Sequence, residues 1–252
     1  MGLSLTITAL AALGELRPGD DLGEQLAAVV PPDLRDDDLI AVAHKAVSKA
    51  ESRVRRLAEI QPGERARALA AEQGGKDPRL VQAVLDESAE LLRAEAGVLI
   101  CVTRHGLVCA NAGVDQSNAS DEGELLLLPE DPDRSARELR ERIGALTGVR
   151  PALLVTDSFG RAWRMGQTDV AIGAAGLQPL EDWQGRPDGF GRELRVTAIA
   201  IGDAAAGAAD LARAKDSRQP AVLIRGLGRH VTAEDGPGAA ALRRPREQDL
   251  FR

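Results

Sequence analysis

The chain has 252 residues, of which 44% are hydrophobic and 28% charged, as in an ordinary globular protein. A net charge of -7 argues against non-specific binding to nucleic acid or membranes, because such partners attract a basic surface. No apolar run approaches the ~20 residues of a membrane span, and the first residues lack the basic start of a signal peptide. We therefore expect a cytoplasmic protein.

Aromatic residues make up only 2% of the chain, so its core must consist of Ala, Val, Leu and Ile. Cys101 and Cys109 are the only cysteines, and their spacing fits neither a zinc site nor a redox motif. Buried, reduced thiols are the prediction, which suits a cytoplasm.

The first part of the chain alternates short strands and helices. Residues 3–12 predict a strand, and residues 22–30 predict a helix that Asp20 or Asp21 caps and that Pro31-Pro32 stops. A second strand, 38–43, is followed directly by His44, with Lys49 five residues further along the chain. Basic and hydroxyl residues at the N-terminus of a helix can bind phosphate. The same pattern also suits the start of an amphipathic helix with solvated lysines.

Residues 62–95 predict two helices, one over 64–73 and one that starts at Asp77-Pro78 and continues past Leu91. Next come strands at 97–103 and 107–110, joined by a short Gly-containing turn that favours a hairpin. This hairpin leads to a polar loop over 111–118, after which Leu125–Leu128 predicts a buried strand.

The remaining elements are less regular. We predict them, in order, as a helix from Asp131 to Thr147, a strand at 152–156, a polar loop at 161–169, a Gly-rich strand at 170–180, a loop at 183–191, a strand at 193–201, a helix at 203–215 and a strand at 221–225. Because helices and strands follow no steady βαβ order, we expect an α+β fold with mixed sheets and packed helices. We predict one domain over 1–231 and a mobile C-terminal tail over 232–252.

Two acidic loops carry the clearest chemistry. Asp115 and Asn118 follow one strand-like run, and Asp157 and Ser158 follow another. Acid, amide and hydroxyl oxygens at strand ends suit Mg²⁺ or Mn²⁺ that also holds phosphates, as phosphoryl transfer requires. The same residue types are also ordinary turn residues, and residue spacing alone does not decide between the two readings.

Several stretches together resemble one family, the coenzyme F420-0:L-glutamate ligases, in a single-domain form. The stretches are GELRPGDDL (14–22), VSKAE (47–51), TRHG (103–106), GVDQSN (113–118), TDSFGRAWR (156–164), GQTD (166–169) and AIGAAGL (171–177). The resemblance implies an intertwined α+β homodimer that uses GTP to activate the carboxylate of F420-0 as an acyl phosphate. L-glutamate then attacks it, and further γ-linked glutamates can follow.

The resemblance also implies roles for particular residues. Asp115, Asp157 and Ser158 match metal ligands, the two acids being catalytic, with Mg²⁺ or Mn²⁺ as the ion and K⁺ as a further candidate. Nucleotide or ligand contacts are implied for the remaining positions: Leu13, Gly14, Glu15, Leu16, His44, Lys49, Asn118 and Lys215. No flavin is expected, because the chain ends near where a flavin-binding domain would begin in two-domain relatives.

Departures from the family pattern keep other functions open. Ser158 stands where Thr is usual, Gly14 replaces Pro, and Ala204 replaces Glu. One alternative is a metal-dependent amide ligase with a different acceptor. The other is a non-catalytic protein that binds a nucleotide or F420.

Overall fold

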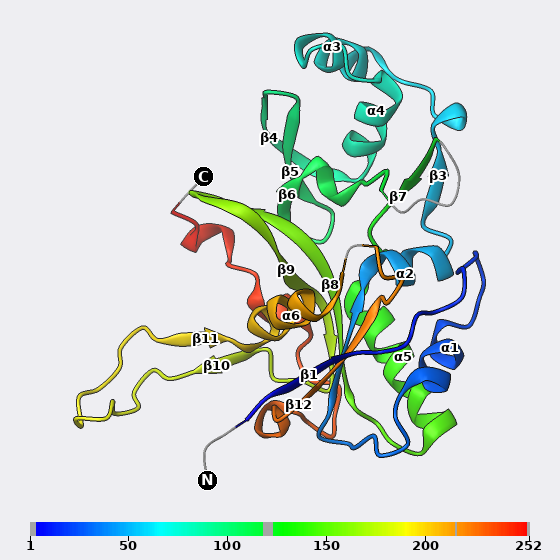
Figure 1. The fold of residues 1–252 in the computed structure, drawn as a ribbon. Helices are drawn as coiled ribbons and strands as arrows, with labels where there is room; N and C mark the ends of the chain where they lie inside the picture. Colours follow the sequence, from blue (N-terminus) through cyan, green and yellow to red (C-terminus); the bar gives the residue numbers. More distant parts are fainter. Residues whose placement is uncertain (1–3, 118–122, 215, 251–252) are drawn as a thin grey trace.

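The computed structural model describes residues 4–117, 123–214 and 216–250 (Figure 1). Its centre is a five-stranded sheet in the order β1-β12-β2-β8-β9, in which only β2 and β8 run parallel. The strands are β1 (Thr6–Ala9), β2 (Leu39–Ala43), β8 (Ala152–Arg161), β9 (Arg164–Ala175) and β12 (Ala221–Arg225). The predicted α+β class with mixed sheets is confirmed.

Alternate residues of the central strands face two different cores, because side chains point to opposite faces along a strand. Ile40 and Val42 pack with helices α1 (Leu22–Val29), α2 (His44–Ala50) and α5 (Pro132–Thr147). Leu39 and Ala41 pack instead with α6 (Ile201–Ala212), on the other face. The sheet therefore lies between helices on both sides, and its central strands are buried.

A small lobe, residues 54–127, lies beyond one end of the sheet and has its own core (Figure 1). It contains β3 (Val54–Arg56), α3 (Glu64–Glu72), α4 (Pro78–Asp86), β4 (Ser88–Glu95), β5 (Val98–Thr103), β6 (Val108–Ala110) and β7 (Glu124–Leu126). β3 pairs with β7, and β4, β5 and β6 form a separate sheet. The remaining strands, β10 (Leu180–Asp182) and β11 (Ala198–Ala200), form an arm that extends away from the body (Figure 1).

The predicted helix starts are confirmed by their capping contacts. The side chains of Asp21, Asp77 and Asp131 each accept a backbone N–H in the first turn of the following helix. Gly148, with φ 77°, ends α5 in the left-handed conformation that glycine adopts without strain. Glycine is also required at position 173 of the predicted Gly-rich strand, because a Cβ there would clash with the Pro132 carbonyl.

The predicted second helix of the small lobe is wrong beyond Asp86. Residues Ser88–Glu95 form β4, which pairs with β5 through a turn at Ala96 and Gly97, both with positive φ. Leu, Ala and Glu favour helix locally, but pairing with a neighbouring strand outweighs that preference here.

Two predictions in the second half of the chain are also wrong. The expected polar loop 161–169 is part of the hairpin of β8 and β9, whose tip protrudes into solvent, with Trp163 85% and Met165 92% exposed. The expected strand 193–201 is a strand only from Ala198, and α6 already begins at Ile201. Residues 193–197 do alternate apolar and polar types, but Val196 is 87% exposed, so this alternation does not mark a buried strand face.

The C-terminal segment lies against the domain. Its backbone N–H groups at Ala239 and Ala240 donate to Asp133, and the Arg243 guanidinium contacts the His105 carbonyl. Arg140, only 1% exposed, donates to the carbonyls of Thr232 and Ala233 and pairs with Asp235 at 2.8 Å. These contacts locate the segment, and its mobility in solution stays a prediction.

The buried contacts of Arg140 should contribute to the stability of the protein. Arg140→Met should lower the free energy of unfolding by about 3 kcal/mol, because it leaves several carbonyl oxygens without a donor inside the protein. Arg137→Met is the matched control, since Arg137 lies on the same helix, is 40% exposed and approaches Asp131 only at 3.9 Å. That control should change stability by less than about 0.5 kcal/mol. Denaturant unfolding of both variants measures this, and equal losses would contradict the assignment.

Candidate active site

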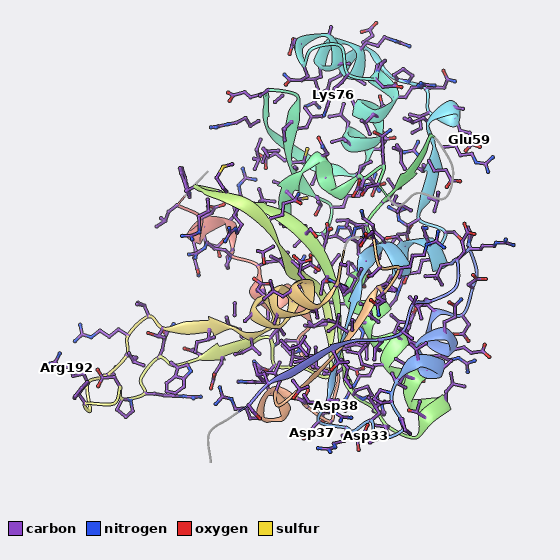
Figure 2. The ribbon with its side chains drawn as sticks, in the orientation of Figure 1. Asp33, Asp37, Asp38, Glu59, Lys76 and Arg192 are labelled. Carbon is purple, nitrogen blue, oxygen red and sulfur yellow. The ribbon has the colours of Figure 1, made fainter. Side chains whose placement is uncertain are left out.

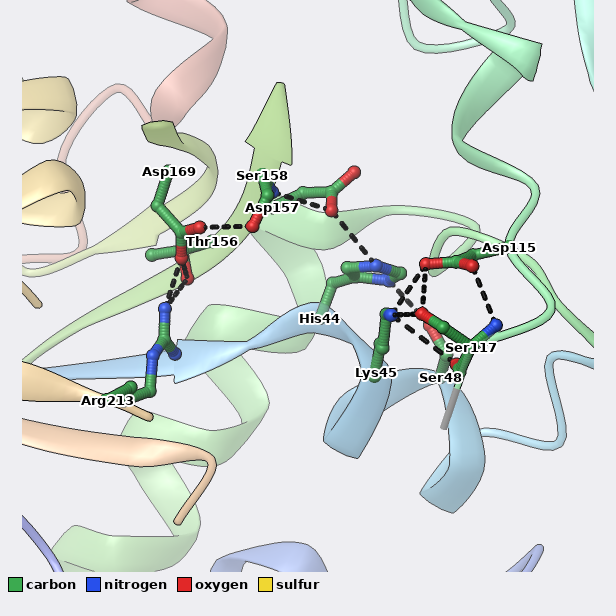
Figure 3. Close-up of polar contacts among 10 residues, drawn as sticks. All are labelled: His44, Lys45, Ser48, Asp115, Ser117, Thr156, Asp157, Ser158, Asp169 and Arg213. Carbon is green, nitrogen blue, oxygen red and sulfur yellow. Dashed lines mark hydrogen bonds and ion pairs between the residues drawn. The ribbon is translucent and has the colours of Figure 1, made fainter. Parts of the chain in front are cut away.

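The parallel pairing of β2 and β8 builds the centre of the site. Their register sets Ala43 opposite Thr156, so the next residues along the chain, His44 and Asp157, emerge side by side. His44 Nε2 lies 3.2 Å from Asp157 Oδ1, and Nδ1 lies 3.3 Å from the Ser48 hydroxyl (Figure 3). The His44 ring is 2% exposed and the Asp157 side chain 14%, so both are held in place by their surroundings.

A cavity of about 490 Å³ opens where β2 ends beside the middle of β8, so Asp157 and Ser158 lie within a strand and not in the predicted loop. It is lined by most of the residues that the sequence singles out: Leu13, Gly14, Glu15, Leu16, His44, Lys49, Asp157 and Ser158. Carboxyl ends of parallel strands are a usual location for ligand sites. Asn118 and Lys215 lie outside the described residues.

Asp115 belongs to the small lobe and is not among the described residues that line the cavity, but it contacts Lys45, which is. The Lys45 ammonium, which lines the cavity, lies 2.6 Å from Asp115 Oδ2 and 2.6 Å from the Ser117 hydroxyl (Figure 3). Burial acts to raise the pKa of Asp115, but hydrogen bonds from Lys45 and the Ser117 amide outweigh it, so the pKa lies below its usual value. Lys45 thus joins the small lobe to the first turn of α2.

A second cluster lies on the β8–β9 hairpin. The Ser158 hydroxyl donates to Asp169 Oδ1 at 2.6 Å, and the Thr156 hydroxyl donates to Asp169 Oδ2 at 2.8 Å. Arg213, at the end of α6, pairs with the same carboxylate (Figure 3). Sequence reasoning did not assign Lys45, Asp169 or Arg213 to the site, although GQTD was among the matching stretches.

The two cysteines confirm the expectation of buried, free thiols. Cys101 and Cys109 are cross-strand partners on β5 and β6. Burial, with a smaller effect of the Asp157 charge, raises the pKa of Cys109 to about 12. Neither thiol therefore suits nucleophilic chemistry at neutral pH.

The oxygens of Asp115, Asp157 and Ser158 are of the type that Mg²⁺ and Mn²⁺ prefer. Among the described residues, no three His, Cys, Asp or Glu side chains form a ready metal cluster. A cation held by one or two carboxylates, with water and phosphate oxygens completing its shell, fits this donor set better than a site made of protein ligands alone.

The protein thus has an α+β fold with a cavity at the junction of β2 and β8, and comparison with known proteins identifies its family. The profile of the family described as F420-0:Gamma-glutamyl ligase matches residues 11–226. The chain therefore belongs to the F420-0:gamma-glutamyl ligase family.

Individual relatives agree over the full length. A protein from Methanopyrus kandleri named coenzyme F420:L-glutamate ligase is 46% identical over 240 residues, which cover 94% of each chain. Proteins of the same name from Methanothermobacter thermautotrophicus and Haloarcula marismortui are both 41% identical, covering 100% and 98% of this chain and 100% and 96% of theirs. Within the described part of the chain, no helix is both long and apolar enough to cross a membrane.

The lowered pKa of Asp115 leads to a pH-dependence prediction. A carboxyl whose pKa is depressed on folding stabilises the protein above its unfolded pKa of about 3.9, and this contribution is lost as pH falls through the folded pKa. Lys45→Met should remove the main stabilising partner, so the variant should be less stable than the unmodified protein near pH 6.5. The difference, about 1 kcal/mol or less for such a partly exposed pair, should shrink as pH falls below about 4.

Urea unfolding at pH 6.5 and pH 3.5, in the presence of a chelator, measures this difference. Lys76→Met, far from the site in the small lobe (Figure 2), is the control for loss of a lysine. A Lys45→Met deficit that is the same at both pH values would contradict the role of the Asp115 charge.

Proposed function

We propose that this protein is a GTP-dependent ligase that joins L-glutamate to coenzyme F420-0 and can add further glutamates in γ linkage. One observation carries the proposal: residues from four separate segments of the chain line one cavity, namely Leu13–Leu16, His44 with Lys49, Asp157–Ser158 and Asp169. The full-length identity to proteins named for this reaction supports it as well.

The chemistry has two steps. A carboxylate oxygen of F420-0 attacks the γ-phosphorus of GTP, the bond to the β-phosphate oxygen breaks, and GDP leaves. The amine of L-glutamate then attacks the acyl phosphate carbon, loses a proton, and expels inorganic phosphate as the amide forms. Phosphoryl transfer depends mainly on positioning the reactants and on neutralising phosphate charge, because the protein itself forms no covalent bond to the phosphoryl group.

The cavity offers groups for both tasks. Lys45 and Lys49 bring positive charge to its wall, which suits phosphate oxygens. Asp115, Asp157 and Ser158 would hold Mg²⁺ or Mn²⁺, which when bound neutralises charge on the transferring phosphate. His44, whose Nε2 faces Asp157, would orient that carboxylate by hydrogen bonding.

We further propose that the protein works as a homodimer. Two protruding hairpins expose large apolar side chains: Phe190 is 94% exposed and Val196 87% on the β10–β11 arm, and Trp163 and Met165 lie at the β8–β9 tip. Exposed apolar groups gathered on protruding elements favour a protein interface over bare solvent. The arm end, where Arg192 also lies, projects clear of the body (Figure 2).

The activity prediction uses purified protein, F420-0, GTP, Mn²⁺ or Mg²⁺ and L-glutamate. Mass spectrometry should detect glutamylated F420, with release of GDP and phosphate. Asp115→Asn and Asp157→Asn should each lower turnover by at least about 100-fold, because each loses an oxygen charge that holds the cation. Asp33→Asn is the control: Asp33 pairs with Arg225 near the start of β2, away from the site (Figure 2), and should leave turnover within about twofold.

Two results would count against this proposal. GTP binding without any glutamylated product would favour a non-catalytic binding protein or a different acceptor. Near-normal turnover in both aspartate variants would remove the metal assignment.

The dimer prediction needs a separate measurement. Light scattering after gel filtration should give twice the mass of the 252-residue chain. Replacing Phe190 and Val196 together by Ser should shift the protein toward the monomer, because it removes apolar area from the arm. Leu211→Ser is the matched control, since Leu211 is 90% exposed on α6 and not on a hairpin. A monomeric unmodified protein at working concentration would reject the proposal.

A further inference from the structure

Asp169 lies at the wall of the cavity, yet none of the site chemistry described so far requires it. It is 3% exposed and stands directly opposite Ser158 in the β8–β9 register. Each of its carboxylate oxygens is engaged: Oδ1 accepts from Ser158, and Oδ2 accepts from Thr156 and pairs with Arg213. A buried carboxylate with this many partners is held in one orientation.

The hydrogen-bond directions in this cluster are set by chemistry. An ionised carboxylate can only accept, whereas a hydroxyl has one proton and two lone pairs. Because the contact at 2.6 Å commits the Ser158 proton to Asp169, Ser158 meets a ligand in the cavity as an acceptor. An acceptor oxygen can bind a cation or an N–H donor, and it would repel an acceptor atom of the ligand.

Arg213 fixes the other side of Asp169. Its guanidinium also donates to the Thr156 hydroxyl at 2.9 Å and to the Pro220 carbonyl at 3.0 Å, and its side chain is 8% exposed. Its guanidinium presents a rigid, planar set of donors. The carboxylate cannot turn away from Ser158 without breaking contacts to both Arg213 and Thr156.

We infer that Asp169 is a positioning residue that acts through Ser158. It takes the hydroxyl proton, so that the Ser158 oxygen is presented as a ligand to the cation that accompanies the nucleotide, and Arg213 locks Asp169 in that role. The inference rests on the proposed function, because it assigns the cavity a cation and a nucleotide.

The Asp169→Asn variant isolates this role. The amide keeps the shape of the carboxylate but has one acceptor end and one donor end. Arg213 takes the amide oxygen, so the NH₂ group faces Ser158 and donates to the oxygen that should serve the cation. Mn²⁺ affinity should fall about tenfold, within the range typical of residues that orient metal ligands.

A double-mutant cycle tests the inference without measuring turnover. Mn²⁺ affinity is measured by titration calorimetry in the presence of a GTP analogue with a non-hydrolysable β–γ bridge. The proteins are the unmodified chain, Ser158→Ala, Asp169→Asn and the double variant. We expect Asp169→Asn to weaken binding about tenfold in the unmodified background and less than twofold in the Ser158→Ala background, because its effect passes through the hydroxyl.

A fourth variant covers the chance that Asp169→Asn folds poorly with Arg213 left beside a neutral partner. In Asp169→Asn combined with Arg213→Met, the amide can turn its oxygen to Ser158, so Mn²⁺ affinity should recover toward that of the unmodified protein. A merely structural role would not produce this recovery.

Three outcomes would overturn the inference. One is an equal loss of affinity from Asp169→Asn with and without the Ser158 hydroxyl, and another is no loss from a folded Asp169→Asn. The third is further weakening in the Arg213→Met combination. An unmodified protein that binds the analogue but no Mn²⁺ would remove the cation and this inference while leaving the nucleotide assignment, and one that binds neither would overturn the proposed function itself.

Discussion

The parallel pairing of β2 with β8 is the contact on which the rest of the site depends. It brings two segments more than a hundred residues apart into one register, so that His44, directly after β2, lies beside Asp157, within β8. β2 is buried on both faces and continues without a loop into α2, which leaves His44 no freedom to move away from Asp157. The other three pairings of the described strands in this sheet are antiparallel.

The second constraint is the junction between the sheet and the small lobe. Asp115 belongs to a lobe with its own core, while its partner Lys45 belongs to the first turn of α2. The position of Asp115 at the site therefore depends on how the two bodies meet, and hydrogen bonds of Lys45 to Asp115 and Ser117 contribute to that junction. Arg53 also contributes hydrogen bonds near this junction, one to the Leu128 carbonyl and one to Glu87 at 2.7 Å.

The sequence predicts best what is decided locally. Asp before Pro marks the starts of α4 and α5, and runs such as Leu39–Ala43 are too apolar to lie anywhere but inside. It fails where a distant partner decides: Ser88–Glu95 becomes a strand because β5 is beside it, and residues 164–169 extend β9 because β8 does. The same reason explains the site, because Asp169 lies opposite Ser158 only once β8 and β9 are paired, a register that no local pattern shows.

Three acids of the site already have nitrogen partners in the protein alone. Asp157 faces His44, Asp115 faces Lys45, and Asp169 faces Arg213. The three pairs differ in burial: the Asp169 and Arg213 side chains are 3% and 8% exposed, whereas the Asp115 and Lys45 side chains are 41% and 23% exposed. Only the exposed pair can exchange partners at low cost, because water can solvate each group as it separates. An arriving cation would therefore compete with Lys45 for Asp115, while the buried pair keeps the β8–β9 side of the cavity fixed.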